Sequence, residues 1–490
     1  MTGQRTYVDV ASRSIQHYIS RTPRLKGQRG ASAWLSDATG HGQVRALLDE
    51  RGLAARLGAE VNPEAGVADG VVSVRFPAGP DPEEIAWEIA EYLRGVLPAI
   101  ELDGVWDTGL SYLEVYRDSL KGQRANPPLR SFPPPSEFPP LETCAECRAD
   151  PAVGTVDIHQ VTDRRVCLDC LRRYDDRYRR PGLARHTRLD DHGRDAGLPV
   201  YREERQIALA LGRDPIRGTV QDFTDLAAQG GEGSNRNHIA TMYADGNMIG
   251  AFFDRVIAHG DPALKGKISA AVSAATRSAL LEATRAVADP DQRTALPVIP
   301  HVVGGDDVIV SVTADRAWSF TLVYLDEFSR RLAGTDGIPG ELLKPVPPSA
   351  SAGLVFAHAK FPFRRAAELA ADQMRAAKKY GKGAEPAVAW LDVTRDGEHP
   401  PAGQCPWPLV DLVGLSDAVR ALRTDVPPSG LAVLSGLVDA EPPELALARL
   451  RDHARRLERD TVLAPFLGSD DPAAAVQRIA GALSLARWWR

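Results

Sequence analysis

The sequence lacks the features that are typical of membrane proteins, of secreted proteins and of proteins that bind nucleic acid through their net charge. It has no apolar run of membrane-spanning length, and its first ten residues lack the charged and then apolar pattern of a secretory signal. Only 5 cysteines occur in 490 residues, which excludes a disulfide scaffold. The formal net charge of −6 excludes a global basic field for nucleic acid. We therefore expect a cytoplasmic protein whose contacts with RNA or DNA are local or shared with other subunits.

What the sequence does contain is centred on the stretch from His301 to Val310. Strand-forming residues precede Gly304, Gly305, Asp306 and Asp307, and a second run of strand formers follows. This pattern predicts a tight β-hairpin with two carboxylates at its tip, where the glycines permit positive φ and close approach of a ligand. Nucleotide cyclases and polymerase palms present acids to Mg²⁺ and a triphosphate in this way. The alternative is an ordinary hairpin turn with solubilising acids.

The pattern of residues 217–398 favours the first interpretation. We expect strands over 238–243, 297–303, 308–312, 352–358 and 387–393, and helices over 248–259, 266–288, 315–332 and 363–380. This β-α-β-β-α-β order is the ferredoxin-like or palm arrangement, in which the first strand lies beside the central hairpin. Asp245, at the end of that strand, is then expected next to the two hairpin acids. Taken alone, Asp245-Gly246-Asn247 is an ordinary turn.

Three neighbouring carboxylates suit a site for two metal ions. Two Mg²⁺ ions about 4 Å apart need bridging carboxylates from adjacent strands. Such ions lower the pKa of an attacking 3′-hydroxyl and hold the triphosphate, and Mg²⁺ takes its remaining ligands from phosphate and water. Lys378, near the end of the predicted helix 363–380, is a candidate phosphate contact. The alternative is a lysine that complements the helix dipole.

A second candidate site consists of two Cys-x₂-Cys pairs. Cys144 and Cys147 are followed, after nineteen residues, by Cys167 and Cys170. This spacing is typical of a tetrahedral Zn²⁺ site with four protein ligands and no open position for catalysis. The alternatives are free thiols or redox pairs. We expect structural zinc, which would stabilise a segment too short to build its own core.

The residues on either side of the cysteines give weaker signals. A mixed α/β unit is expected over the first 100 residues, with a helix from Ile15, a loop over 25–34 opening a second helix, and a hairpin over 67–76. Residues 125–140 form a proline-rich linker. Residues 161–210 hold twelve arginines and nine acidic residues, which indicates a solvated face or, alternatively, a surface for RNA or a partner subunit.

The order of these motifs resembles the large, polymerase-like subunit of type III CRISPR–Cas effector complexes. The residues that carry the resemblance are Ser14-Ile15-Gln16, Leu25-Lys26, Gly30-Ala31-Ser32, the four cysteines, Asp245-Gly246-Asn247, Gly304 to Asp307, Ser351 to Gly353, His358, Phe361-Pro362 and Ala377-Lys378. The resemblance implies an α+β fold: two ferredoxin-like palm domains joined by a zinc-binding segment, with a C-terminal helical bundle. We expect a degenerate first palm over 1–124, the linker and zinc segment over 125–216, the second palm over 217–398, and helices over 399–490.

The resemblance also implies an activity, the conversion of ATP to cyclic oligoadenylate and pyrophosphate in antiviral signalling. Asp245, Asp306 and Asp307 would be the catalytic Mg²⁺ or Mn²⁺ ligands. Gly304, Gly305, Asn247 and Lys378 would bind the nucleotide. The implied partners are ATP and the effector subunits with their guide RNA and target RNA, and a homodimer is possible.

One departure from this family concerns its N-terminal nuclease domain. Many members begin with a His-Asp nuclease, but no His-Asp dipeptide occurs in this sequence, so we expect no DNase activity from such a domain. A reduced relative that signals without guide RNA is one alternative. A GTP-using diguanylate-cyclase-like enzyme is another, although Val308 stands where that family prefers an aromatic residue. A third is a non-catalytic scaffold, which would have no need for clustered carboxylates.

Overall fold

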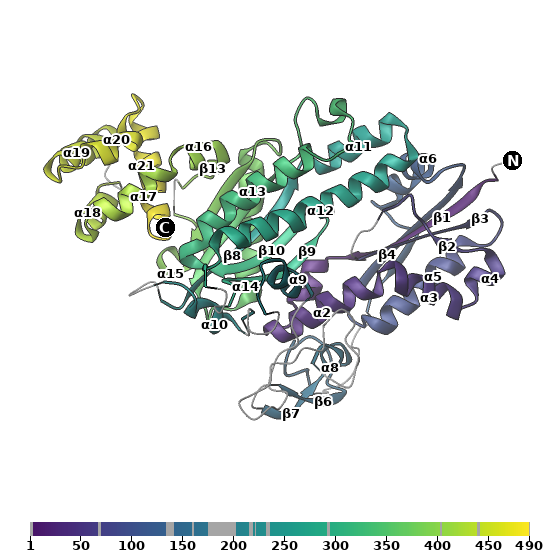
Figure 1. Cartoon of the computed structure of the whole chain (residues 1–490). Coiled ribbons are helices and arrows are strands. Elements are labelled where there is room, and N and C mark those ends of the chain that lie inside the picture. The colour runs from purple at the N-terminus through teal and green to yellow at the C-terminus, as the bar shows by residue number, and fades with distance from the viewer. Residues whose placement is uncertain are drawn as a thin grey trace.

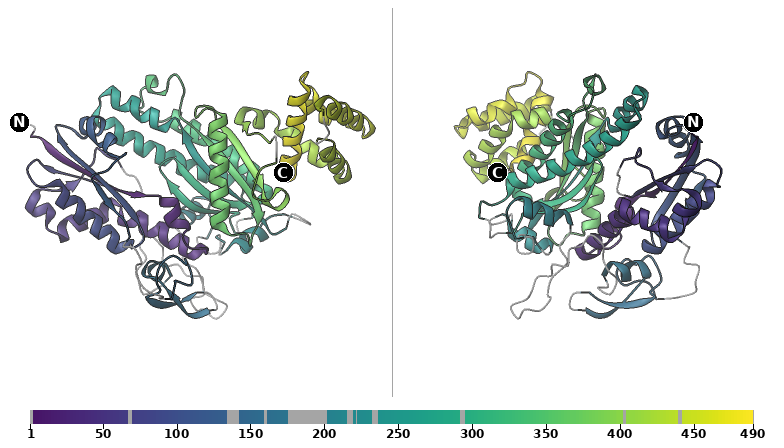
Figure 2. Two further views of the ribbon diagram at one scale, coloured as in Figure 1. Left: turned by 180° about the vertical axis from the view of Figure 1, so that it is seen from behind. Right: turned by 45° about the vertical axis from the view of Figure 1, so that its right-hand side comes forward.

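The computed structural model describes residues 3–66, 70–133, 142–158, 161–174, 202–214, 219–220, 222–231, 236–291, 295–401, 404–438 and 442–489. Two β-sheets lie side by side, and a group of helices at the C-terminal end flanks the second sheet (Figure 1). A small unit of two strands and one helix projects from the first sheet, as the views of Figure 2 also show. No helix in the described part of the chain is both long and apolar enough to cross a membrane.

The first sheet has the strand order β2-β3-β1-β4-β5. Its strands are β1 (Arg5–Arg13), β2 (Glu60–Val61), β3 (Val71–Pro77), β4 (Glu101–Gly109) and β5 (Leu129–Ser131). Its helices are α1 (Ile15–Ser20), α2 (Leu25–Ala38), α3 (His41–Glu50), α4 (Leu53–Leu57) and α5 (Pro82–Val96). Alternation along β1 places Val8 and Val10 in the core beneath these helices. The helix α5 begins at an Asp81 cap followed by Pro82, which are strong helix-start signals.

The opposite face of the first sheet is covered by a short helical stretch. It comprises α6 (Tyr112–Val115), the π-helix η1 (Tyr116–Leu120) and α7 (Lys121–Gln123). Tyr7 and Val105 pack against Tyr112 and Leu120 there. This face turns towards the second sheet and forms one wall of the site described below.

Some local predictions for the N-terminal part were wrong. Residues 25–34 are helical and belong to α2, because the apolar positions of this stretch face the sheet core. Residues 71–76, the second half of the hairpin predicted over 67–76, form part of the strand β3, which pairs with β1 and β2. Residues 67–69 lie outside the described residues. The linker predicted over 125–140 contributes β5 to the first sheet, and its residues 134–140 also lie outside the described part.

The second sheet has the strand order β13-β12-β11-β8-β10-β9. Its strands are β8 (His238–Asn247), β9 (Val298–Gly304), β10 (Asp307–Thr313), β11 (Ser349–His358), β12 (Ala387–Asp392) and the short β13 (Trp407–Pro408). The strands β2-β3-β1-β4 of the first sheet and β9-β10-β8-β11 of the second follow the ferredoxin-like order, so the predicted fold class is confirmed. The strand β8 lies between β10 and β11, and its position beside the hairpin is the one that the sequence pattern predicted.

Helices cover both faces of the second sheet. The helices α11 (Ile249–His259), α12 (Pro262–Val287) and α13 (Ala317–Ala333) lie on one face, where Met242 and Val310 are buried. The helix α14 (Phe363–Tyr380) lies on the other face, where Tyr243 and Ile309 point. Neighbouring residues of one strand therefore face different helices, as the period of two requires.

The projecting unit consists of β6 (Gly154–Ile158), β7 (Val161–Val166) and α8 (Leu168–Tyr174). It is fixed to the first palm by Arg173, whose buried guanidinium donates to the carbonyl of Tyr18 at 2.8 Å and to Asp169 at 2.8 Å. Gly30 allows this contact, because a Cβ there would lie 2.7 Å from the carbonyl oxygen of Arg173. Residues 175–201, most of the arginine-rich segment, lie outside the described residues.

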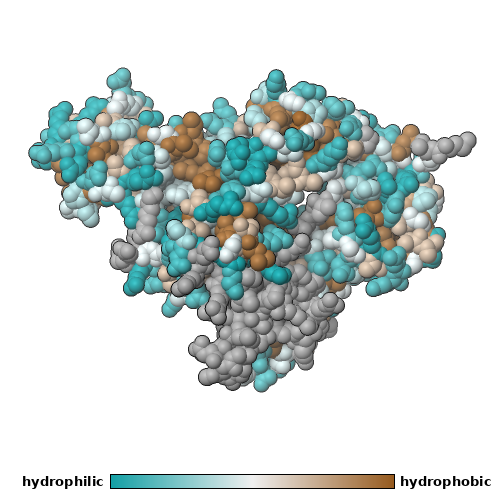
Figure 3. Space-filling view, viewed as in Figure 1, coloured by the Kyte–Doolittle hydropathy of each residue, from teal (hydrophilic) through white to brown (hydrophobic). Residues whose placement is uncertain are grey.

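The C-terminal part is a helical bundle, apart from the strand β13, which the helices-only expectation missed. Its helices are α16 (Leu409–Gly414), α17 (Ser416–Asp425), α18 (Pro428–Val438), α19 (Pro443–Arg456), α20 (Asp460–Leu467) and α21 (Pro472–Ala486). Trp488 stacks on Phe356 of β11 with ring centroids 5.4 Å apart, and its indole donates to Asp392 at 2.8 Å. The bundle therefore shares one continuous core with the second sheet. Polar residues cover most of the face shown in Figure 3, and apolar residues form separate patches on it.

Candidate active site

The Gly-Gly-Asp-Asp stretch forms the predicted hairpin between β9 and β10. Gly304 pairs with Asp307, and Gly305 and Asp306 form the tip. Gly305 has a φ of 57°, a conformation that glycine adopts readily. Thr276 of α12 donates to the carbonyl of Gly305 at 2.6 Å. The tip is therefore fixed from behind by a helix and remains open in front, since a Cβ at Gly305 would meet no atom within 4 Å.

The strand pairing brings Asp245 to the hairpin acids. Val308 pairs with Ala244, so Asp307 and Asp245 are the next residues along the two paired strands. Asp306 reaches the backbone of β8, where a Cβ at Gly246 would lie 2.7 Å from its Oδ2. The sequence did not reveal this role of Gly246, which is to leave room for a carboxylate from the hairpin.

The three carboxylates form a negatively charged, partly buried cluster. Burial, followed by the charge of Asp245, raises the pKa of Asp306 to about 6. Burial and the charges of Asp245 and Asp306 raise the pKa of Asp307 to about 8. Burial and the charge of Asp307 also raise the pKa of the Tyr243 phenol. Such a cluster gains stability from a cation.

An ammonium group supplies one positive charge at this cluster. Lys378, in the last turn of α14, forms an ion pair with Asp245 and donates to the carbonyl of Gly246 at 2.8 Å. Both side chains of the pair are about a quarter exposed, which leaves the ammonium accessible from the solvent side. The predicted lysine therefore lies at the acids.

The three carboxylates come from two paired strands and from the hairpin tip between β9 and β10. Carboxylates that share two metal ions need not converge on one point. The donor set of three acid groups without nitrogen or sulfur fits hard cations such as Mg²⁺ or Mn²⁺.

Asn247, the other predicted nucleotide contact, is buried in the sheet. Its side-chain amide donates to the hydroxyls of Ser349 and Ser351 at 3.1 and 2.9 Å. Its Oδ1 accepts no hydrogen bond from the described residues. The amide therefore links β8 to β11 next to Asp245, and a nucleotide role for this residue stays a prediction.

One functional contact comes from the first palm and was missed by the sequence analysis. Gln16 of α1 donates from Nε2 to the phenol oxygen of Tyr243 and to Asp307 Oδ2, the latter at 3.3 Å. Tyr243 in turn donates to Asp307 Oδ1 at 3.3 Å. Gln16 belongs to the motif Ser14-Ile15-Gln16, but nothing in the local sequence links it to an acid nearly 300 residues away.

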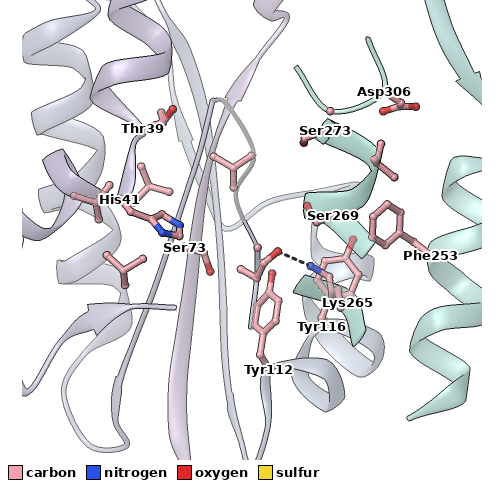
Figure 4. Close-up of a pocket in the computed structure, with 18 of the residues that line it drawn as sticks. Thr39, His41, Ser73, Tyr112, Tyr116, Phe253, Lys265, Ser269, Ser273 and Asp306 are labelled. Carbon is pink, nitrogen blue, oxygen red and sulfur yellow. Dashed lines mark hydrogen bonds between the residues drawn. The ribbon is translucent and has the colours of Figure 1, made fainter. Parts of the chain in front are cut away.

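Two cavities lie on either side of the acid cluster. The first, of about 340 Å³, is lined by Ser73 and Tyr112 of the first palm and by Lys265, Ser273 and Asp306 of the second (Figure 4). It lies on the side of α11 and α12.

The second cavity, of about 380 Å³, is lined by Gln16 and His17 of the first palm and by Tyr243, Ile309 and Phe363 of the second. It lies on the side of α14. Each cavity is thus built from both palms, and the acid cluster is placed between the two.

The four predicted zinc ligands also come together. Their Sγ atoms all lie within 4.8 Å of one another, and those of Cys147 and Cys167 are 3.7 Å apart. Tetrahedral Zn²⁺ with bonds of about 2.3 Å requires sulfur atoms about 3.8 Å apart. Backbone amides of Cys147 and Cys170 donate to the sulfurs of Cys144 and Cys167 at 3.5 and 3.4 Å. The arrangement fits Zn²⁺, and Cys405 lies apart from it.

Comparisons with known proteins agree with this geometry. Residues 238–385 match the family model of the Cas10/Cmr2 second palm domain. No curated protein matches the chain in sequence. The fold is similar to that of the Csm1-Csm4 cassette in complex with pppApA, with a TM-score of 0.60, 14% identity, and coverage of 99% of this chain and 70% of that one.

Two further solved structures show the same fold. The Csm1-Csm4 cassette in complex with cA4 gives a TM-score of 0.56 at 15% identity, with coverage of 99% of this chain and 70% of that chain. Csm1 from T. onnurineus gives 0.53 at 14% identity, with coverage of 98% and 69%. Fold and site together define a two-palm protein with a Gly-Gly-Asp-Asp hairpin in its second palm. Residues 238–385 thus match the Cas10/Cmr2 second palm domain, and the chain is similar in fold to Csm1.

Proposed function

We propose that the chain is a nucleotidyltransferase that converts ATP to cyclic oligoadenylate and pyrophosphate. The observation that carries this proposal is the position of the acid cluster between two cavities that are each lined by both palms. Joining two nucleotides needs a place for the one that brings the 3′-hydroxyl and a place for the one that brings the triphosphate. The similar Csm1-Csm4 structures were solved in complex with pppApA, cA3 and cA4, which supports the assignment of product class.

In this proposal Asp245, Asp306 and Asp307 hold the divalent metal. When bound, Mg²⁺ or Mn²⁺ lowers the pKa of the attacking hydroxyl and neutralises charge on the triphosphate. The 3′-oxygen attacks the α-phosphorus, the bond to the β-phosphate oxygen breaks, and pyrophosphate leaves with its electron pair. In the last step the 3′-hydroxyl of the linear product attacks its own 5′-α-phosphorus, the bond to the β-phosphate oxygen breaks, and a further pyrophosphate leaves as the ring closes.

The other side chains bind and orient the reactants. Lys378 stabilises negative charge on the phosphate oxygens from its place beside Asp245. Gly304, Gly305 and Gly246 keep the backbone free of side chains where the phosphates pass. Gln16 and Tyr243 fix the orientation of Asp307 through their hydrogen bonds to its two carboxylate oxygens.

The wider assignment follows the same resemblance. Zn²⁺ held by the four cysteines would have a structural role in joining the palms. We propose that the chain works in a type III CRISPR effector complex with guide RNA and target RNA, because the similar Csm1 chains are described in the type III-A interference complex. The sequence-based boundaries at residues 124, 216 and 398, the homodimer and the cytoplasmic location remain proposals.

The test is mass spectrometry of the products formed from ATP or GTP with Mg²⁺ or Mn²⁺. The protein is assayed first alone, and then with its co-expressed neighbouring subunits and target RNA. We expect cyclic oligoadenylate from the unmodified protein and none from Asp306→Ala combined with Asp307→Ala, which should still fold and assemble. Products from GTP alone would favour the diguanylate-cyclase-like alternative. Absence of product in the complete complex would favour the scaffold alternative.

A further inference from the structure

The first cavity contains a buried basic residue that the proposed reaction leaves without a task. Lys265 of α12 is only 8% exposed and lines the same cavity as Ser269, Ser273 and Asp306. Figure 4 shows these side chains along one side of α12, with Asp306 at one end and Lys265 at the other. At 1.5 Å per residue, Lys265 lies roughly 12 Å along the helix from Ser273. A ligand that reaches from the acids to Lys265 must therefore be elongated.

The surroundings of Lys265 leave hydrogen-bonding capacity free. Its Nζ lies 4.8 and 4.6 Å from the ring centroids of Tyr112 and Tyr116, and it donates to the carbonyl of Ala65 at 3.3 Å. No carboxylate in the described part of the chain forms an ion pair with it. An ammonium has three donors, and one carbonyl satisfies only one of them. Burial, the largest cause, lowers the pKa of this amine to about 8.

The other residues at this end of the cavity suit a flat ring. Tyr112, Tyr116 and Phe253 supply aromatic surface from both palms, and Ser269 supplies a hydroxyl (Figure 4). Asp306, one of the acids that would hold the metal, lies at the opposite end. A nucleotide held by its phosphates near Asp306 would therefore extend its base towards Lys265.

We propose that Lys265 is a specificity-determining residue, which donates a hydrogen bond to a ring nitrogen of a purine base bound in the first cavity. This inference rests on the proposed function, because it assumes that the cavity takes a nucleotide. Purines present ring-nitrogen acceptors at their edges, and a buried donor left without its acceptor carries a free-energy cost. Lys265 thus favours bases that offer an acceptor at the position it reaches.

A purely structural role for Lys265 is the competing explanation. Its side chain crosses from the second palm to the Ala65 carbonyl of the first and lies near the buried Asp9, so it also ties the palms together. Loss of this contact between the palms would lower the stability of the protein, but it would weaken the binding of all nucleotides equally. The distinguishing measurement is therefore a change in the choice between bases.

The experiment measures equilibrium binding of ATP and of 1-deaza-, 3-deaza- and 7-deaza-ATP to the full chain by calorimetry. Each analogue replaces one ring nitrogen by C–H. The variants are Lys265→Met, Lys265→Arg and the control Lys267→Met, which changes an exposed lysine on the same helix. We expect one analogue to bind the unmodified protein about tenfold more weakly than ATP. For Lys265→Met that difference should vanish while ATP itself binds about tenfold more weakly, and Lys267→Met should match the unmodified protein.

Each outcome decides the question. Equal binding of ATP and all three analogues by the unmodified protein would overturn the inference even if Lys265→Met did not fold. A difference between analogues that persists in both Lys265 variants would also overturn it, as would the absence of nucleotide binding. Binding that depends on Lys265 without any product would support the inference and refute the proposed synthase. Product formation with unchanged base preference in Lys265→Met would support the proposed synthase and refute the inference about Lys265.

Discussion

Lys378 and Asp245 form an ion pair that joins the last turn of α14 to the central strand of the second sheet. The pair places a positive charge beside three carboxylates, and each of its two side chains is about a quarter exposed. A cation at this position can neutralise phosphate oxygens that approach the acids. The same geometry makes Lys378 sensitive to substitution in a way that its exposed neighbour Lys379 is not.

We predict that Lys378→Met lowers kcat/KM for ATP by about ten- to a hundredfold, since one charge-assisted hydrogen bond is lost. Lys379→Met, which changes an exposed lysine next in sequence, serves as the control and should stay within about twofold of the unmodified protein. Initial rates of pyrophosphate release measure both. Equal losses in the two variants would mean that only the general charge at the end of α14 matters.

Gly246→Ala should abolish activity without unfolding the second palm. A Cβ at this position would lie 2.7 Å from Asp306 Oδ2 and 2.4 Å from Ile249 Cγ1, so the hairpin acid must move. We expect a loss of at least about a hundredfold in rate, because a displacement of 1 Å at the reacting groups already has an effect of this size. Gly250→Ala is the matched control, since its Cβ would meet no atom within 4 Å. Retained activity in Gly246→Ala would place Asp306 outside the metal site.

The metal-free protein should lose stability as the pH rises. The pKa values of Asp306 and Asp307 are raised to about 6 and about 8, so the folded state holds protons that the unfolded state releases near pH 4. Their contribution to stability is complete below about pH 4 and is lost as the pH passes 8. Urea unfolding with EDTA between pH 5 and 9 measures this slope. The double variant Asp306→Asn with Asp307→Asn should flatten it.

Binding of a divalent ion should show the opposite trend. Because the carboxylates must lose their protons to bind metal, the affinity for Mn²⁺ should increase between pH 6 and 8 and protons should be released. Calorimetry in two buffers of different ionisation enthalpy counts those protons. An affinity that does not change with pH in this range would show that Asp306 and Asp307 are not the ligands.

Zinc removal should loosen the projecting unit and the contact of α8 with the first palm. We expect one Zn²⁺ per chain by elemental analysis, and its loss in Cys147→Ser. Cys405→Ser should retain it, since Cys405 lies outside the cluster. The loss of a structural zinc removes folding free energy directly, so proteolysis of the segment 142–174 should become faster. A Cys147→Ser protein with unchanged zinc content would contradict the four-cysteine site.

Local patterns were enough to predict the parts of the fold and the site that depend on neighbouring residues. The turn chemistry of Gly304 and Gly305 predicted the hairpin, and the strand order predicted that Asp245 lies beside Asp307. Contacts between distant segments leave no such local signal. Gln16 reaches Asp307 across two domains, and Lys265 becomes a cavity residue only because the first palm packs against α12.

The wrong predictions have the same origin. Residues 25–34 contain two glycines, which favoured a loop, but this stretch packs as part of α2 against the core of the first sheet. The strand β5 lies in a proline-rich stretch where local propensity argues against any sheet. In both cases tertiary contacts outweigh the local preference.

The packing of Trp488 against Phe356 has a consequence for the synthesis of the chain on the ribosome. The strand β8 leaves the ribosome early. Phe356 and Asp392, which lie on later strands of the same sheet, find their partners only when residues 487–489 have been made. Until then the apolar surface around Trp318 and Phe356 has no cover, and such surfaces aggregate readily. The first palm can fold while the second palm is still being made. The half of the molecule that carries the Gly-Gly-Asp-Asp hairpin is therefore the last to become stable and the one most in need of chaperone protection.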